Sequence, residues 1–270
     1  MFPILFEFGF ITVFSLWLLA AAGFVTGSLV FVKLAKRYRV KLDVFSGHSA
    51  GLALFTLIIS RIIFVAVHYD LYFYNFRIFN VLAIWDKGLS FWGAAGALTF
   101  GIWHLCKNKR ASFWKMLDIM APAVLIAISI GSIGAFLDGI NHGTPTELPW
   151  GMEFRSANVK YVSPIHPTQL YGAIYTGILA YILIKMLRTL NTRMPGATVE
   201  IGALTFSILK FLEEFIRGDE TVELLGIRVP QLIAAITAVF FAYRVYKRHF
   251  NTSNSGEIDR EPRALKNQTM

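Results

Sequence analysis

Residues 131–171 read GSIGAFLDGINHGTPTELPWGMEFRSANVKYVSPIHPTQLY. In this stretch Gly, Pro, Asp, His, Asn, Gln and Tyr interrupt the aliphatic and aromatic residues that fill the chain on either side. Polar side chains at membrane depth are tolerated mainly where they face protein or a wet cavity, and connecting segments often carry function. We therefore expect the apolar helices to be organised around this segment, and a binding or catalytic site to lie beside it.

The composition of the chain is typical of a membrane protein. Of its 270 residues, 55% are hydrophobic and 16% are charged, and the mean hydropathy is +0.54. A soluble domain carries about 25% charged residues. Several apolar runs approach the roughly 20 residues that a helix needs to cross a bilayer. The predicted fold class is an all-α integral membrane protein.

Seven apolar segments are predicted to be transmembrane helices. The segments that follow the first, third, fifth and seventh helices are basic, whereas those that follow the second, fourth and sixth are acidic or mixed. By the positive-inside rule, the N-terminus is then outside and the C-terminus cytoplasmic. The predicted helices cover residues 11–35, 48–68, 91–105, 116–139, 167–187, 200–216 and 230–246.

This topology predicts one membrane domain, residues 1–248, followed by a polar, basic tail at 249–270 that we expect to be disordered. The polar stretch at 131–171 would lie near the outer side of the membrane. No internal repeat or soluble second domain is evident in the sequence.

The net charge of +9 and the pI of about 9.7 raise the question of nucleic-acid binding. The Lys and Arg residues, however, lie in loops between apolar runs, which is the pattern of membrane orientation and of attraction to anionic lipid. We therefore expect membrane lipid and no nucleic acid as a partner. The single cysteine, Cys106, excludes an intramolecular disulfide and a CxxC metal site.

Four charged residues lie inside the predicted helices, where each charge costs at least about 2.5–3.5 kcal/mol: Arg61, Asp138, Lys210 and Glu214. Lys210, Glu214 and Arg217 are spaced at i, i+4 and i+7, so we expect them to share one helix face. One interpretation is a structural ion pair between Lys210 and either Glu214 or Asp138. The other is a cationic pocket for an anionic lipid headgroup. Arg217 alternatively extends toward the membrane interface.

The segment HPTQLY, residues 166–171, combines several polar groups at the start of the fifth helix. Pro167 suits the first turn of a helix, and Gln169 then places an amide at the membrane edge. His166 is a candidate base, proton relay or ordinary loop residue. It has no companions at metal-ligand spacing, so we expect no metal site.

The order of these motifs resembles the prolipoprotein diacylglyceryl transferase family, from about residue 10 to residue 248. Arg61 stands where that family has an arginine in its second helix. The segments that carry the resemblance are GLSFWGAAGAL (88–98), DIMAP (118–122), GSIGAFLDGINHGTPTELPWGMEF (131–154), HPTQLY (166–171) and KFLEEFIRGD (210–219).

The resemblance implies an enzyme of the bacterial plasma (inner) membrane. Such enzymes move a diacylglyceryl group from phosphatidylglycerol to the lipobox cysteine of a prolipoprotein signal peptide, and glycerol phosphate leaves; no cofactor or metal is required. Together, the motifs and the resemblance give His166, Lys210 and Glu214 as candidate catalytic residues. The candidate substrate-binding residues are Arg61, Ser132, Asp138, Gln169, Tyr171 and Arg217.

The sequence also departs from the family pattern at positions that carry its chemistry. Ser132 and Ala135 stand where the family has Arg and Asn, and Trp92 stands where it has the proposed base, a His. Lys210 replaces an Arg, which keeps the charge but loses the bidentate fork, and Gly172 replaces a Glu. The candidate substitutes are Lys210, Arg61 and Arg155 for phosphate binding, and His166 and Glu214 for the base.

These departures leave two alternatives to an active transferase. The first is a degenerate family member that binds lipid or a lipoprotein precursor without turnover. The second is a small-solute transporter, which the lack of internal repeats disfavours.

Overall fold

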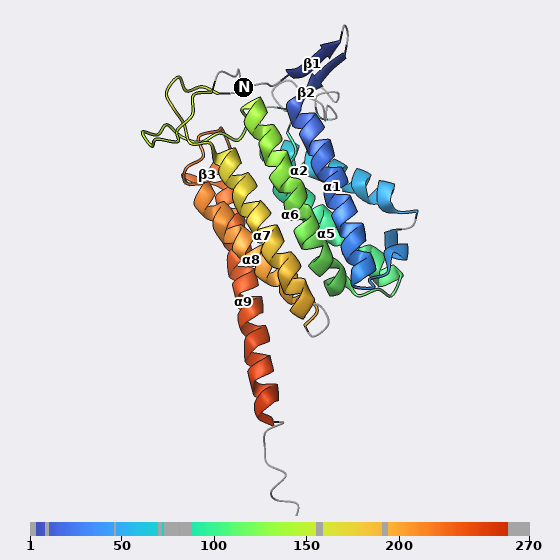
Figure 1. Ribbon diagram of the computed structural model, residues 1–270. Coiled ribbons are helices and arrows are strands. Elements are labelled where there is room, and N and C mark those ends of the chain that lie inside the picture. The colour runs from blue at the N-terminus through green and yellow to red at the C-terminus, as the bar shows by residue number, and fades with distance from the viewer. Residues whose placement is uncertain are drawn as a thin grey trace, which may run out of the picture.

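The structure, a computed structural model, describes residues 4–8, 11–45, 47–69, 72, 81, 88–154, 159–190 and 194–258. Among these residues, seven helices of at least 17 residues form a bundle (Figure 1). They are α1 (Ser15–Arg37), α2 (Ser49–Val67), α5 (Phe91–Asn108), α6 (Phe113–Asp138), α7 (Thr168–Leu190), α8 (Ala197–Glu213) and α9 (Val229–Ile258). Five of them, α1, α2, α6, α7 and α9, are long and apolar enough to cross a membrane.

The bundle has the surface of a membrane protein. Large apolar side chains are exposed along its helices: Phe24 is 67% exposed, Ile178 56% and Val239 71%. Charged side chains such as those of Asp118 and Glu200 are instead completely buried. In soluble proteins, by contrast, large apolar side chains such as these are among those most often buried. The chain is a multi-pass membrane protein.

The start of the chain differs from the prediction. Residues Ile4–Phe8 (β1) and Ile11–Phe14 (β2) form an antiparallel hairpin, so the predicted helical start at residue 11 is wrong, and α1 begins at Ser15. The β-branched run Ile11, Thr12, Val13 favours a strand over a helix. A 3₁₀ turn, η1 (Leu42–Phe45), follows α1, and a short hairpin of β3 (Glu223–Leu224) and β4 (Ile227–Arg228) precedes α9.

Two glycines four residues apart allow α1 to approach α6 closely. A Cβ atom on Gly23 would lie 2.7 Å from the carbonyl oxygen of Ala127, and one on Gly27 would lie 2.8 Å from that of Ala123. Small residues at this spacing let helix backbones meet in a membrane, where packing rather than the hydrophobic effect drives association. Helix α6 also packs against α7, α8 against α9, and α2 against α5.

Basic residues gather at one end of the bundle. Lys36, Lys107 and Arg188 lie in the last turns of α1, α5 and α7, and these helices run in the same direction (Figure 1). The hairpin β1–β2 and the segment between α6 and α7 lie at the opposite end. The chain therefore separates its basic ends from its polar stretch, as the loop charges predict.

Buried hydrogen bonds join α6 to the start of α8 near the basic end, and buried ion pairs join α8 to α9. The carboxylate of Asp118 accepts a hydrogen bond of 2.6 Å from the backbone N–H of Gly196, which has a φ of 93° and precedes α8. The fully buried Glu200 binds Arg244 at 2.6 Å and Arg248 at 2.7 Å. This anchorage explains why α8 begins at residue 197 rather than at the expected residue 200.

The ends of the last two helices also differ from the predictions. Helix α8 ends at Glu213 and passes into a turn, so Arg217 lies beyond the helix on which it was predicted. Helix α9 continues to Ile258, and the first part of the expected tail is therefore helical. Residues 259–270 lie outside the described part of the chain.

Candidate active site

The polar stretch after α6 folds back onto the turn that follows α8. Helix α6 is capped by Gly139, at a φ of 85°. The backbone N–H of Gly143 then donates to the carbonyl of His166 at 3.0 Å, and that of Thr144 donates to Ile216 at 2.9 Å. A Cβ atom on Gly143 would lie 2.6 Å from the His166 oxygen and 2.9 Å from the Ile216 oxygen. Glycine is therefore required where these segments meet.

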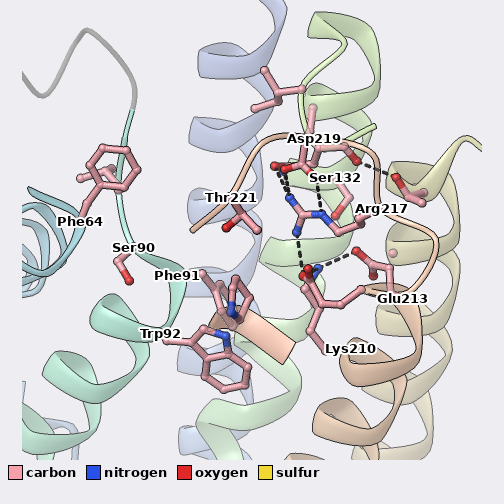
Figure 2. Close-up of a pocket in the computed structure, with 18 of the residues that line it drawn as sticks. Phe64, Ser90, Phe91, Trp92, Ser132, Lys210, Glu213, Arg217, Asp219 and Thr221 are labelled. Carbon is pink, nitrogen blue, oxygen red and sulfur yellow. Dashed lines mark hydrogen bonds and ion pairs between the residues drawn. The ribbon is translucent and has the colours of Figure 1, made fainter. Parts of the chain in front are cut away.

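Below this segment the helices surround a cavity of about 840 Å³. Residues from all seven long helices line it, together with the segments before α5 and α9. Figure 2 shows Phe64 and Ser90 on one side of the cavity and Lys210, Glu213 and Arg217 on the other. The cavity thus has a largely apolar and aromatic wall that faces a charged one.

The charged wall is built around Glu214, whose side chain is fully buried. Its carboxylate accepts hydrogen bonds from Arg217 at 3.1 Å and from Arg228 at 2.8 Å. Asp219 binds the same two arginines, at 2.8 Å from Arg217 Nε and 3.0 Å from Arg228 Nη2. Arg217 also donates to the side-chain oxygen of Asn141 at 3.0 Å. These bonds fix the polar stretch after α6 to the end of α8.

A second group of charged side chains extends this wall along α8. The Lys210 ammonium lies 2.5 Å from Glu213 Oε1 and 3.8 Å from Glu214 Oε1. The Tyr175 hydroxyl donates to Glu213 Oε2 at 2.7 Å. The structure therefore supports the ion-pair interpretation of Lys210 and Glu214, and adds Glu213 as the nearer partner.

Glu213 occupies the space beside two of the positions at which the sequence departs from the family pattern. A Cβ atom on Gly172 would lie 3.8 Å from Glu213 Oε2 and 3.5 Å from the hydroxyl oxygen of Ser132. The carboxylate that the family pattern places on residue 172 is thus replaced in space by one from α8.

The ion-pair network consists of equal numbers of basic and acidic side chains: Lys210, Arg217 and Arg228 against Glu213, Glu214 and Asp219. A buried charge is stable only when it is paired and hydrogen-bonded, which explains this balance. The six side chains of this network are therefore balanced in charge, and the cationic pocket for a lipid headgroup stays a prediction. The Arg217 side chain is only 12% exposed, because it is held within this network.

The segments that follow α6 and α8 each contain an ionisable group with a shifted pKa. Burial disfavours the charge of Asp219, but hydrogen bonds and the charge of Arg217 outweigh it, so the pKa of this carboxyl lies below its ordinary value. Burial lowers the pKa of His142. Its ring lies edge-on to Tyr161, and neither ring nitrogen has a hydrogen-bond partner among the residues that the structure describes. His142 is therefore expected to be neutral.

The structure divides the predicted site residues into two groups. Five of them line the cavity together: Ser132, Gln169, Lys210, Glu214 and Arg217. Four are not among the described residues that line it: Arg61, Asp138, His166 and Tyr171. Arg155 lies outside the described residues.

Arg61 supports the aromatic wall from behind. Its buried guanidinium donates to the carbonyl oxygens of Gly88 at 2.8 Å and Val81 at 2.9 Å, and lies 5.7 Å from the ring centre of Phe64. The positive charge that was predicted to bind substrate therefore holds the segment that enters α5.

His166 belongs to a separate hydrogen-bonded group. Its Nδ1 lies 3.3 Å from the hydroxyl oxygen of Tyr171, which also accepts a hydrogen bond of 2.8 Å from the indole of Trp150. These contacts connect the polar stretch to the first turns of α7.

Several residues of the site were missed by the sequence analysis: Asn141, Tyr175, Glu213, Asp219 and Arg228. The sequence Glu213–Glu214 contained a signal, because both carboxylates lie at the end of an apolar helix. No sequence signal identified Arg228, since it lies in a loop that is otherwise mostly acidic.

The fold and the site together define a multi-pass helical membrane protein with a cavity lined partly by buried ion pairs. The chain matches the family model for prolipoprotein diacylglyceryl transferase over residues 3–246. It belongs to that family, and the resemblance in the sequence is confirmed.

Proteins named phosphatidylglycerol–prolipoprotein diacylglyceryl transferase are similar to the chain over most of their length. The one from Gloeobacter violaceus is 30% identical over 239 residues, which cover 86% of this chain and 87% of the relative. The one from Synechococcus sp. (strain CC9902) is 31% identical over 252 residues, covering 88% and 89%. The one from Finegoldia magna is 27% identical over 239 residues, covering 88% and 92%.

Proposed function

We propose that this protein transfers a diacylglyceryl group from phosphatidylglycerol to the lipobox cysteine of a prolipoprotein, in the plasma (inner) membrane of a bacterium. The observation that carries the proposal is the position of Lys210, on the wall of a cavity of about 840 Å³ in a member of this family. A cation at this depth is suited to an anionic phospholipid.

The reaction places definite demands on the cavity. The cysteine sulfur attacks the glyceryl carbon that carries the phosphate, a C–S bond forms, and the C–O bond to the phosphate breaks. Glycerol phosphate leaves with the electron pair of that bond. Lys210 stabilises the charge that develops on the leaving oxygen, because a fixed cation away from bulk water acts strongly on such charge. Ser132, on the same wall, supplies a neutral donor where the family pattern has an arginine.

Gln169 offers a partner for the glycerol headgroup. Its Nε2 donates to the carbonyl of Ile140 at 2.6 Å, whereas its buried Oε1 has no hydrogen-bond partner among the residues that the structure describes. An unsatisfied buried acceptor is costly, and a hydroxyl group that donates to it removes the cost. Phosphatidylglycerol carries two such hydroxyls on its headgroup.

The proposed topology has seven spans, with α5 and α8 crossing the membrane beside the five more apolar helices. The basic ends of α1, α5 and α7 then face the cytoplasm, and the polar stretch and β3–β4 lie at the outer side. Both substrates reach the cavity from the membrane, where the donor lipid and the signal peptide are held.

A second function, binding of lipid or lipoprotein precursor without turnover, is favoured by specific residues. Trp92, Ser132 and Ala135 stand where the family pattern has its base, an arginine and an asparagine. The balanced ion-pair network also leaves no excess positive charge among its six side chains.

The test is transfer by purified protein in nanodiscs that contain phosphatidylglycerol with a labelled diacylglyceryl group. A lipobox peptide is the acceptor, and the same peptide with Ser in place of its Cys is the control. We expect labelled thioether peptide and glycerol phosphate in equal amounts with the Cys peptide alone. Bound phosphatidylglycerol without transfer would establish the second function, and loss of both binding and transfer would contradict both.

A further inference from the structure

His68 stands at the end of α2 and lines the cavity on the aromatic wall, with Phe64, Ser90 and Trp92. The sequence analysis gave it no role. It is the only histidine among the described residues that line the cavity. Trp92, on the same wall, stands where the family pattern has its proposed base, so the wall lacks a basic side chain at that position.

The hydrogen bond of His68 defines its tautomer. The Nδ1 atom lies 3.0 Å from the carbonyl oxygen of Phe64, and a carbonyl oxygen can only accept. Nδ1 therefore carries the proton, and in the neutral ring the lone pair is on Nε2. Among the residues that the structure describes, no hydrogen-bond partner occupies Nε2. In this tautomer Nε2 is the ring atom that can accept a proton.

The ring of His68 is held in place by its surroundings. It stacks on Phe64, with ring centres 4.1 Å apart and an angle of 23° between the rings. Phe64 packs in turn against Gly88, whose φ of 98° only glycine adopts easily and whose carbonyl is held by Arg61. The Ser60 hydroxyl donates to the carbonyl of Ser90 at 2.8 Å. These contacts hold the imidazole ring in a fixed orientation, as a general base requires.

We propose that His68 is the general base that activates the acceptor thiol, an inference that rests on the proposed function. His68 Nε2 takes the proton of the cysteine S–H as the sulfur attacks the glyceryl carbon. The C–S bond forms, the C–O bond to the phosphate breaks, and the phosphate oxygen keeps the electron pair. The imidazolium then returns its proton to the departing glycerol phosphate or to water.

The position of His68 relative to Lys210 suits this displacement. Phe64, on which the ring stacks, and Lys210 lie on opposite sides of the cavity (Figure 2). In a displacement at carbon, the nucleophile enters opposite the leaving group. The base on one wall therefore suits the attacking sulfur, and the cation on the opposite wall suits the leaving phosphate oxygen.

The other candidates for the base are less well placed. Both oxygens of the Glu214 carboxylate already accept hydrogen bonds from arginines, so the carboxylate is engaged in the ion-pair network. His166 is bonded to Tyr171 and is not among the described residues that line the cavity. The other titratable side chains of the described cavity lining are those of Tyr175, Lys210, Glu213, Arg217, Asp219 and Glu220. Arg61 lies behind the aromatic wall, where it binds the carbonyl of Gly88.

The experiment compares wild type, His68→Ala and His68→Gln in the transfer assay. His104→Ala is the control, because His104 is exposed on α5 and bonds only its neighbour Asn108 among the described residues. Removal of a general base lowers kcat by about 100- to 10,000-fold. We expect this loss in both His68 variants, with the KM for phosphatidylglycerol within a few-fold of wild type. Added imidazole should partly restore His68→Ala.

The pH dependence separates a base from a structural residue. A free thiol has a pKa of about 8.5, so its thiolate fraction rises roughly 25-fold between pH 7 and pH 9. The deficit of both His68 variants should shrink by about tenfold or more over this range, because the acceptor then ionises without help.

Two results would overturn the inference while wild type still transfers. One is activity of folded His68→Gln within threefold of wild type. The other is a deficit that stays constant with pH and does not respond to imidazole. If wild type binds phosphatidylglycerol without transferring it, the proposed function fails, and this inference fails with it.

Discussion

The replacement Glu214→Ala tests whether the ion-pair network holds the charged wall together. Glu214 is fully buried and lies 3.1 Å from Arg217 Nη1 and 2.8 Å from Arg228 Nε. Without it, the two guanidinium groups share Asp219 as their remaining carboxylate within the network. The substitution therefore leaves a net positive charge in a buried site.

The size of the effect follows from this geometry. Breaking a buried ion pair by removing one partner costs about 3–5 kcal/mol, since the remaining charge stays buried without full compensation. At about 1.4 kcal/mol for each factor of ten, the unfolding equilibrium shifts by roughly two to nearly four powers of ten. Because Arg228 ends β4 and α9 begins at the next residue, the loss should also loosen the outer end of α9.

The assay is reversible unfolding in mixed micelles of mild detergent and dodecyl sulfate, followed by far-ultraviolet circular dichroism. The matched control is Glu220→Ala, which removes a carboxylate that is 83% exposed and paired with Lys160. An exposed pair contributes less than about 1 kcal/mol. If the free energy of unfolding of Glu214→Ala lies within 1 kcal/mol of that of the control, the stabilising role given to the network is refuted.

Three further predictions concern the packing of the helices, the start of α8 and the segment that follows α8. Gly23→Ala should destabilise the protein by about 1–3 kcal/mol in the same unfolding assay, because the added Cβ would meet the α6 backbone. The control Gly131→Ala should be neutral or slightly stabilising, because there is open space beside Gly131. If Gly23→Ala and Gly131→Ala changed the free energy of unfolding equally, the close packing of α1 on α6 would be contradicted. Asp118→Ala should cost about 1–3 kcal/mol, since the backbone N–H groups at the start of α8 lose a charged acceptor, and an unchanged unfolding curve would exclude this role. The pKa of Asp219 is lower in the folded state than its unfolded value of about 3.9, so its contribution is complete above that pH and is lost as the pH falls through the folded value. Asp219→Asn should therefore be less stable at pH 7 and should show a weaker dependence on pH below about 4; an acid dependence equal to that of wild type would show that other groups carry it.

The approximate positions of the helices could be predicted because each is an apolar run bounded by charged or polar residues. Their ends could not, because distant contacts determine them. Helix α8 begins where Gly196 meets Asp118, which is 78 residues earlier in the chain. The first hairpin was missed since its apolar residues continue directly into α1. The close approach at Gly23 and Gly27 was available in the sequence as a GxxxG spacing.

The site was predictable where a charge stands out against an apolar helix, as at Lys210 and Glu214. Asp219 and Arg228 look like ordinary loop charges, and only the fold brings them to Glu214. His68 sits at a helix end, where a histidine is unremarkable in sequence. The role proposed for His68 depends on the cavity wall that α2 and the start of α5 form together.

The most direct test of the proposed mechanism is the transfer rate of Lys210→Ala relative to wild type and Lys210→Arg, with folding and phosphatidylglycerol binding measured in parallel. Removal of one group that stabilises the developing charge costs about 100- to 1,000-fold in kcat. We predict a loss of this size for Lys210→Ala and substantial activity for Lys210→Arg, which keeps the cation. Wild-type transfer that continues undiminished in Lys210→Ala would contradict the role of this cavity in the reaction.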